Sequence, residues 1–306
     1  MPTPLEPPKK EYPSTYFVQD RSNKEELIRV MIQDQLVTAG MGGVLPEQPD
    51  STIFQRVLDV GCGTGGWLIE AARTYPAMSL LVGVDVSERM IEYAQAQAEA
   101  QQLSDRVQFC TMDALLMLEF PTDYFDLVNQ RFGTSYLRTW DWPKLLHEFQ
   151  RVTRPGGVVR VTEGNFLVQS PSLALTRLYE LALDVFYRAG HYFTAESNGV
   201  TGELARLLHQ YGLQNVQTRV HMMECRAGTV EGQRFYEDMR HFFQTILPFF
   251  RKWSRVPDDY ETIYQQALSE MQQPDFVATS SLLTAWGIKP DPRLKSKFSL
   301  EDSFGG

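Results

Sequence analysis

Residues 57–66 read VLDVGCGTGG, an apolar run that ends in a glycine-rich turn. Gly61, Gly63 and Gly66 have the G-x-G-x-x-G spacing of a dinucleotide-binding turn, where glycine lets the backbone approach a cofactor closely. Asp59, however, lies two residues before the first of these glycines. A carboxylate there would repel a pyrophosphate and attract a ligand that carries positive charge. The stretch therefore predicts an adenosine-bearing cofactor and disfavours NAD, although a dehydrogenase stays an alternative.

The segments around this turn alternate between strand and helix patterns, which is typical of an α/β protein with a doubly wound, mostly parallel sheet. Helical apolar spacing separates most of the strand-like runs. We expect strands at residues 56–61, 80–86, 106–114, 124–132, 158–164, 213–224 and 276–290.

The rest of the chain divides into an N-terminal part, helical additions and a tail. Ser22 and Glu25 form a capping box, which predicts a helix before the first strand. This N-terminal part either closes over the cofactor or simply covers the edge of the sheet or a neighbouring subunit. The expected division is an arm and helix over 1–50, a cofactor-binding domain over 51–290 with helical substrate-binding insertions at about 165–210 and 229–272, and a flexible tail over 291–306.

Composition narrows the class of protein. The 306 residues are 43% hydrophobic and 22% charged, which is ordinary for a soluble domain. A formal net charge of −9 argues against nucleic-acid binding, because no basic surplus is present to neutralise phosphates. The cysteines Cys62, Cys110 and Cys225 have no paired spacing, so neither a disulfide frame nor a metal site is expected. With no signal peptide and no long apolar run, the sequence predicts a cytoplasmic protein without a membrane partner.

Three carboxylates fall at the carboxyl ends of expected strands, where open parallel sheets bind ligands. They are Asp59, Asp85 and Asp113. Each alone is explained by a turn or a helix cap, but together beside one glycine turn they fit S-adenosylmethionine. Asp59 can attract the ammonium and sulfonium groups, and Asp85 can accept hydrogen bonds from two ribose hydroxyls. Asp113 can accept from the adenine amino group, next to the backbone N–H of Ala114.

These residues belong to segments that resemble the class I S-adenosylmethionine-dependent methyltransferases. LDVGCGTGG resembles their first motif, GVDVS their ribose-binding loop and MDA their adenine contact. FDLVNQRF and LLHEFQRVTRPGGVVRVTE resemble the fourth strand and the helix and strand that follow it, so the resemblance covers about residues 55–165. LLTAWGIKP resembles the last strand of the family, which is antiparallel.

The resemblance implies a seven-stranded, Rossmann-like, mostly parallel sheet with an antiparallel last strand, and S-adenosylmethionine as the cofactor. Tyr16 is added to the expected site because the segment before the first strand often closes over the cofactor in related folds. The expected cofactor-binding residues are Tyr16, Asp59, Gly61, Gly63, Gly65, Asp85, Val86, Met90, Asp113, Ala114, Asn129 and Gln130.

The methyl acceptor is less well determined. The segment NQRFGTSY at the end of the fourth strand lacks the proline-bearing motif of amino-methyltransferases that act on DNA or on protein glutamine. The insertions are rich in aromatic residues, and an ordinary core explains most of them. As a group they suit an apolar small-molecule pocket, or a homo-oligomer interface if they are exposed. We therefore expect in-line methyl transfer to a small, partly apolar metabolite. A cofactor-binding module without this activity, or one that serves another reaction, is the alternative.

A general base is needed only if the acceptor loses a proton. His191, Glu163 and Tyr192 are the expected catalytic residues, because they lie at or above the carboxyl end of the fifth strand. Histidine is the commonest base near neutral pH. Gln130 and Arg131, at the end of the fourth strand, are further candidates.

Overall fold

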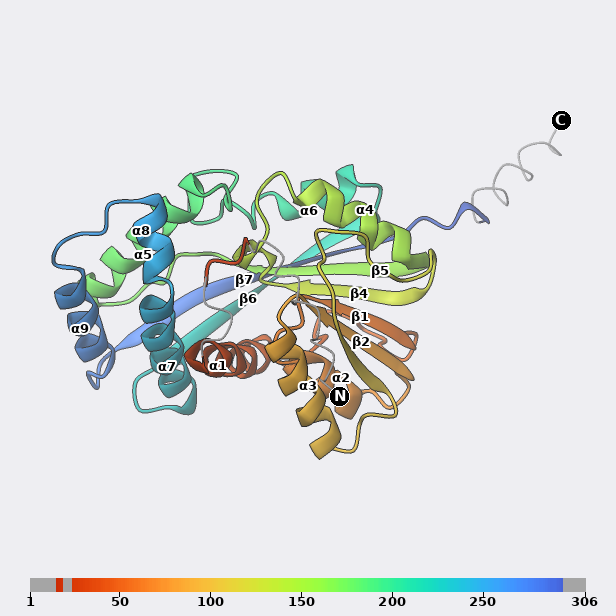
Figure 1. Cartoon of the computed structure of the whole chain (residues 1–306), viewed down its shortest axis with the longest axis horizontal. Helices are drawn as coiled ribbons and strands as arrows, with labels where there is room; N and C mark the ends of the chain where they lie inside the picture. Colours follow the sequence, from red (N-terminus) through yellow and green to blue (C-terminus); the bar gives the residue numbers. More distant parts are fainter. Residues whose placement is uncertain (1–14, 19–23, 294–306) are drawn as a thin grey trace, which may run out of the picture.

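The computed structural model describes residues 15–18 and 24–293 of the chain. Its centre is a seven-stranded sheet with the order β3-β2-β1-β4-β5-β7-β6. β7 pairs antiparallel with both β5 and β6, and the other neighbours pair in parallel, which confirms the expected fold (Figure 1). The strands are β1 (Arg56–Val60), β2 (Leu80–Asp85), β3 (Val107–Thr111), β4 (Phe125–Arg131), β5 (Thr153–Gly164), β6 (Gln214–Arg226) and β7 (Val277–Ile288).

Helices cover both faces of the sheet, and a further group of helices lies beyond one end of it. In Figure 1, α2 and α3 lie on one side of the sheet and α4 and α6 on the other, while α5, α7, α8 and α9 gather beyond the ends of β6 and β7. α1 runs beside α7. The helices are α1 (Lys24–Met41), α2 (Gly66–Thr74), α3 (Glu88–Ala100), α4 (Trp142–Val152), α5 (Leu173–Arg188), α6 (Leu204–Gln210), α7 (Val230–Thr245), α8 (Leu247–Trp253) and α9 (Tyr260–Met271), with a 3₁₀ turn at Gly133–Ser135.

The local signals explain these elements. Val57, Leu58 and Val60 of β1 are fully buried, because helices cover both faces of the parallel part of the sheet. Ser87 caps α3 as expected, since its hydroxyl accepts a hydrogen bond from the backbone N–H of Met90 at 3.4 Å. This strand order places the carboxyl ends of β1, β2 and β3 at one edge of the sheet. The glycine turn and the expected carboxylates therefore lie at that edge.

The sequence places a break at the PGG segment before the fifth strand, but β5 runs through it from Thr153. Gly156 has a φ of +77°, which glycine adopts without strain, and the pairing with β4 shifts its register nearby. The backbone N–H of Gly156 donates to Lys289 O at 2.8 Å, and Lys289 N–H donates to Gly157 O at 2.9 Å. The glycines therefore form a bulge that stays paired instead of ending the strand.

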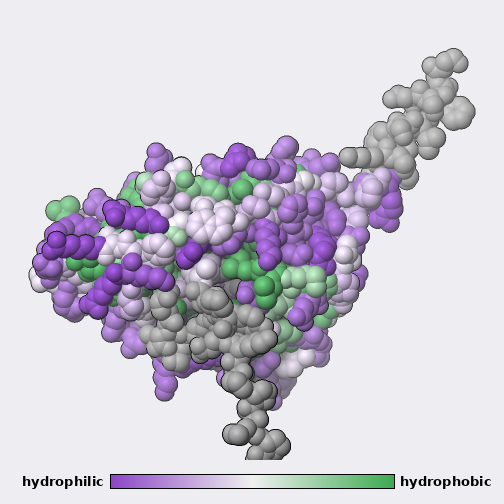
Figure 2. Space-filling model, turned by 45° about the horizontal axis from the view of Figure 1, so that its top comes forward, coloured by the Kyte–Doolittle hydropathy of each residue, from purple (hydrophilic) through white to green (hydrophobic). Residues whose placement is uncertain are grey.

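Three expected features lie outside the described residues: residues 1–14 of the arm, Ser22 of the capping box and residues 294–306 of the tail. Across the ranges 15–18 and 24–293, no helix combines the length and the apolar character that a membrane crossing requires. The face shown in Figure 2 is mainly hydrophilic, with a hydrophobic area near its middle.

Candidate functional site

A cavity of about 310 Å³ lies at the carboxyl ends of the central strands, between the glycine turn, α1 and the helices α5 and α7. Its walls come from segments far apart in the sequence, and most of the expected cofactor residues are among them. Those that line the cavity are Tyr16, Asp59, Gly61, Gly63, Asp85, Val86, Met90, Asp113 and Ala114.

Three expected cofactor residues are not among the lining residues but support the site from behind. Gly65 has a φ of +75°, and a Cβ there would lie 2.5 Å from the ring of Phe109, so this glycine lets α2 pack on the sheet. Asn129 Nδ2 donates to Asp59 Oδ1 at 2.7 Å. Gln130 Nε2 donates to the hydroxyl of Tyr136 at 3.2 Å, and Tyr136 itself lines the cavity.

The glycine turn and Asp85 form a compact unit. Gly63 has a φ of +53°, and its N–H donates to Asp85 Oδ2 at 3.0 Å. The backbone N–H of Ser87 donates to Asp85 Oδ1 at 2.8 Å. These bonds hold the carboxylate at the end of β2, facing the cavity, in the position that suits the hydroxyls of a ribose.

We expect Asp85→Ala to weaken S-adenosylhomocysteine binding by roughly 2 kcal/mol or more, because two charge-assisted hydrogen bonds to the ribose are lost. Titration calorimetry of the two proteins measures this difference. An unchanged affinity would show that Asp85 does not hold the ribose.

Asp59 is buried at the end of β1, and burial raises its pKa to about 7, although the charge of Arg131 and the hydrogen bond from Asn129 oppose the rise. Behind it, Arg160 Nη1 donates to Asn129 Oδ1 at 2.7 Å, and Arg160 Nε donates to Glu47 Oε1 at 2.6 Å. This row of buried polar groups fixes the Asp59 side chain. A positive ligand beside Asp59 would favour its ionised form.

Arg131 adds a positive charge to the same region. It forms an ion pair with Asp34 of α1, and its Nη1 donates to Thr38 Oγ1 at 3.2 Å. Arg131, Asp34 and Asp59 all line the cavity. One guanidinium and two carboxylates complement the carboxylate, ammonium and sulfonium at the methionine end of the cofactor. Sequence reasoning missed Asp34, because only the tertiary fold brings α1 to the glycine turn.

We therefore expect Arg131→Gln to weaken S-adenosylhomocysteine binding about tenfold or more, since a charge-assisted contact to the methionine carboxylate is lost. Binding of methylthioadenosine, which has no amino-acid group, serves as the matched control and stays unchanged. If both ligands lose affinity equally, Arg131 acts on the fold and not on the carboxylate.

The three expected catalytic residues occupy different environments. Glu163 and Tyr192 line the cavity, whereas His191 is not among its lining residues. The hydroxyl of Thr134 donates to Glu163 Oε2 at 2.7 Å, and its backbone N–H donates to Oε1 at 3.2 Å. Burial nevertheless raises the pKa of Glu163 to about 7. A fixed carboxylate with that pKa can exchange a proton near neutral pH.

His191 is fully buried, and its Nδ1 lies 2.8 Å from the backbone oxygen of Thr134. Burial lowers its pKa to about 4. Within the described part of the chain, its Nε2 has no hydrogen-bond partner. Burial also raises the pKa of the Tyr192 phenol, which keeps it protonated. The geometry thus favours Glu163 over both neighbours as the proton acceptor.

The pH–rate profile of His191→Ala is expected to keep the limb near pH 7, because burial raises the pKa of Glu163 to about 7, and a positive cofactor bound beside Asp59 keeps that second carboxylate ionised. Steady-state rates of the variant and the wild type across the pH range test this. If the variant loses the limb, His191 takes the proton.

Aromatic side chains from the N-terminal segment, from the loops after β4, β5 and α5, and from the helices α5 and α7 form the remaining walls of the cavity. The rings of Phe17 and Phe186 have centroids 5.3 Å apart, and Phe186 stacks on Tyr192 at 5.9 Å. These walls suit an apolar part of an acceptor. The aromatic lining residues are Tyr16, Phe17, Phe132, Tyr136, Phe166, Tyr179, Phe186, Tyr192, Phe235 and Phe242.

The segment 15–18 crosses this part of the cavity. The backbone N–H of Phe17 donates to Ser135 O at 3.1 Å, and the Tyr16 hydroxyl donates to Glu26.

Because Tyr16 and Phe17 both line the cavity, we expect deletion of residues 1–22 to lower turnover more than it lowers the melting temperature. Parallel rate and thermal-melt measurements check this, and a truncated protein with full activity would refute a lid.

Comparisons with known proteins point to methyltransferases. The family model of a methyltransferase domain matches residues 57–157. The chain is 33% identical over 255 residues to 27-O-demethylrifamycin SV methyltransferase of Amycolatopsis mediterranei, a match that covers 83% of this chain and 78% of that protein. It is 39% identical over 101 residues to a demethylmenaquinone methyltransferase of Lactiplantibacillus plantarum. That match covers 33% of this chain and spans only 41% of the relative's length.

Among solved structures, the chain resembles phosphoethanolamine N-methyltransferase 2 of Haemonchus contortus, determined with phosphomonomethylethanolamine and S-adenosylhomocysteine. The TM-score is 0.56 at 18% identity, and the match covers 92% of this chain and 61% of that one. At this identity the likeness supports the shared fold.

Proposed function

This chain belongs to the class I S-adenosylmethionine-dependent methyltransferases, and we propose that it transfers a methyl group to a small, partly apolar metabolite. One observation carries the proposal: a cavity joins the cofactor carboxylates Asp59, Asp85 and Asp113 to Glu163 and to the aromatic walls. The relatives named above, which act on a rifamycin and on demethylmenaquinone by their names, support an acceptor of this kind.

The donor set fits the cofactor. The positive φ of Gly61 and Gly63 gives close backbone approach, Asp85 suits the ribose, and Asp59 with Arg131 suits the charged methionine end. When bound, S-adenosylmethionine supplies a methyl group that its sulfonium already activates. The residues of the chain then have to hold the two molecules in line and exclude water.

We assign the proton to Glu163. Its carboxylate oxygens are fixed by Thr134, and it faces the cavity with a pKa of about 7. A hydroxyl acceptor that approaches Glu163 can give up its proton as the new bond to the methyl carbon forms. Tyr192 and the other rings orient the apolar part of the acceptor.

Incubation with S-adenosylmethionine labelled in its methyl group, together with a panel of small hydroxylated ring compounds, tests the proposal. Label in a product supports methyl transfer. If the protein binds the cofactor but releases no label to any compound, it is a cofactor-binding module instead.

A further inference from the structure

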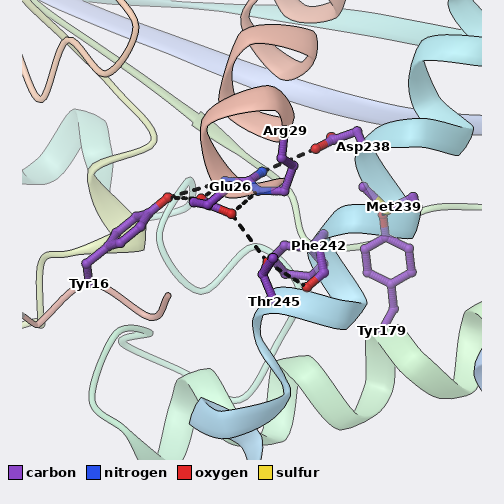
Figure 3. Close-up of polar contacts among 8 residues, drawn as sticks. All are labelled: Tyr16, Glu26, Arg29, Tyr179, Asp238, Met239, Phe242 and Thr245. Carbon is purple, nitrogen blue, oxygen red and sulfur yellow. Dashed lines mark hydrogen bonds and ion pairs between the residues drawn. The ribbon is translucent and has the colours of Figure 1, made fainter. Parts of the chain in front are cut away.

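A buried polar cluster lies between α1 and α7, at the part of the cavity lined by α7 (Figure 3). We define this α1–α7 cluster as Tyr16, Glu26, Arg29, Asp238 and Thr245. Arg29 Nε and Nη2 donate to the two carboxylate oxygens of Glu26 at 2.8 and 2.7 Å. Thr245 Oγ1 also donates to Glu26 Oε2, at 3.3 Å, so both oxygens of Glu26 are occupied within the cluster.

Asp238 is satisfied only in part. Arg29 Nη1 donates to its Oδ1 at 3.2 Å, and no hydrogen bond from residues 15–18 or 24–293 reaches its Oδ2. The side chain is 5% exposed and lines the cavity. Two carboxylates share one guanidinium, so the cluster carries a surplus of negative charge when both are ionised. An acceptor oxygen with this charge costs free energy unless a donor in the cavity pairs with it.

The cavity that Asp238 lines also has aromatic walls. Tyr179, Phe235 and Phe242 line the cavity, and Arg29 lies over the ring of Phe242 at 5.7 Å. The hydroxyl of Tyr179 donates to Met239 Sδ at 2.8 Å, so its proton is not available to Asp238. A buried carboxylate in a cavity with aromatic walls suits an ammonium group on a partly apolar ligand, because the ammonium group forms a charge-assisted hydrogen bond with the carboxylate. An anionic group there would be repelled.

We propose that the methyl acceptor carries a protonated amine that binds Asp238, and that this amine anchors the acceptor without being methylated. The proposal rests on the proposed methyl transfer and narrows its acceptor to small, partly apolar amines. A protonated amine has no lone pair to attack a sulfonium, so the methylated atom lies elsewhere on the molecule. Asp238 is paired with Arg29 in the α1–α7 cluster, whereas Glu163 is held by Thr134 at the end of β5.

Calorimetry with three matched probes tests the proposal: 2-(2-naphthyl)ethylamine, 2-(2-naphthyl)ethanol and 2-naphthylacetate, each titrated into protein saturated with S-adenosylhomocysteine. The amine is expected to bind about tenfold more tightly than the alcohol, and the acid most weakly, because only the amine pairs with the charge of Asp238. Asp238→Asn removes the preference for the amine. Glu231→Gln, which removes an exposed carboxylate from the same helix, keeps it.

Equal binding of amine and alcohol to the wild type, no binding of the amine, or an unchanged preference in Asp238→Asn overturns the proposal. The amide oxygen of the variant can still accept from Arg29. If the variant does not fold, the comparison of amine and alcohol on the wild type decides alone. A separate titration of S-adenosylhomocysteine into ligand-free wild type distinguishes failure of this proposal from failure of the proposed function, because absence of that binding contradicts the proposed function itself.

Discussion

Glu163→Gln is expected to lower turnover about 100-fold or more, because the amide cannot take a proton from the acceptor. In the wild type, turnover falls as the pH drops through about 7, where the Glu163 carboxylate becomes protonated. The variant loses this limb while its affinity for S-adenosylhomocysteine stays the same, since Glu163 is not a cofactor ligand. Rates across the pH range and parallel calorimetry measure both effects.

The melting temperature of Glu163→Gln shows whether lost turnover comes from lost chemistry or from an unfolded protein. The folded pKa of Glu163, about 7, lies above its ordinary value of 4.5, so its contribution to stability is present at low pH and is lost as the pH rises through 7. Glu163→Gln should therefore melt no lower than the wild type at pH 8. Tyr192→Phe, which changes another lining residue, is the matched control and keeps the pH limb. A limb that persists in Glu163→Gln and disappears in Tyr192→Phe would contradict the assignment.

Gly63→Val is expected to abolish S-adenosylhomocysteine binding. The φ of +53° is strained for a β-branched residue, and a Cβ at this position would already lie 3.0 Å from Val30 Cγ1 of α1. The valine methyl groups would also occupy the space through which the backbone approaches the ligand. Calorimetry measures the loss, and a thermal melt shows whether the variant is folded.

Cys62→Ala is the control for the same turn. Cys62 also borders the cavity, but alanine at this position adds no atom to it, so binding should stay close to that of the wild type. A folded Gly63→Val protein that still binds S-adenosylhomocysteine would show that the cofactor does not lie against this turn.

Much of the cofactor side could be predicted from the sequence because its signals are local. Parallel strands place their carboxyl ends at one edge of a sheet, so Asp59 and Asp85 had to meet the glycine turn. Ser87 is a cap in the structure as in the sequence. The predicted start of β5, residue 158, lies five residues after the observed start at Thr153. The prediction is wrong because the glycines of the PGG segment form a bulge that stays paired instead of a break.

The acceptor side could not be predicted in the same way, because it depends on contacts between distant segments. Arg29 and Asp238 are 209 residues apart, and no periodicity links them. His191 and Tyr192 are adjacent in the sequence, yet only Tyr192 lines the cavity. Arg131 is a candidate for proton transfer in the sequence, whereas the structure places it beside the carboxylates of Asp34 and Asp59.

We propose that this protein transfers a methyl group and does not merely bind a cofactor. The most direct test is to incubate the wild type and Asp85→Ala with trideuteromethyl-labelled S-adenosylmethionine and a small-metabolite extract of the organism that encodes the chain, and to follow the label by mass spectrometry. We predict that a small, partly apolar metabolite gains the label with the wild type and gains far less with the variant. Label that stays entirely in the cofactor, although calorimetry shows that the wild type binds it, would contradict the account.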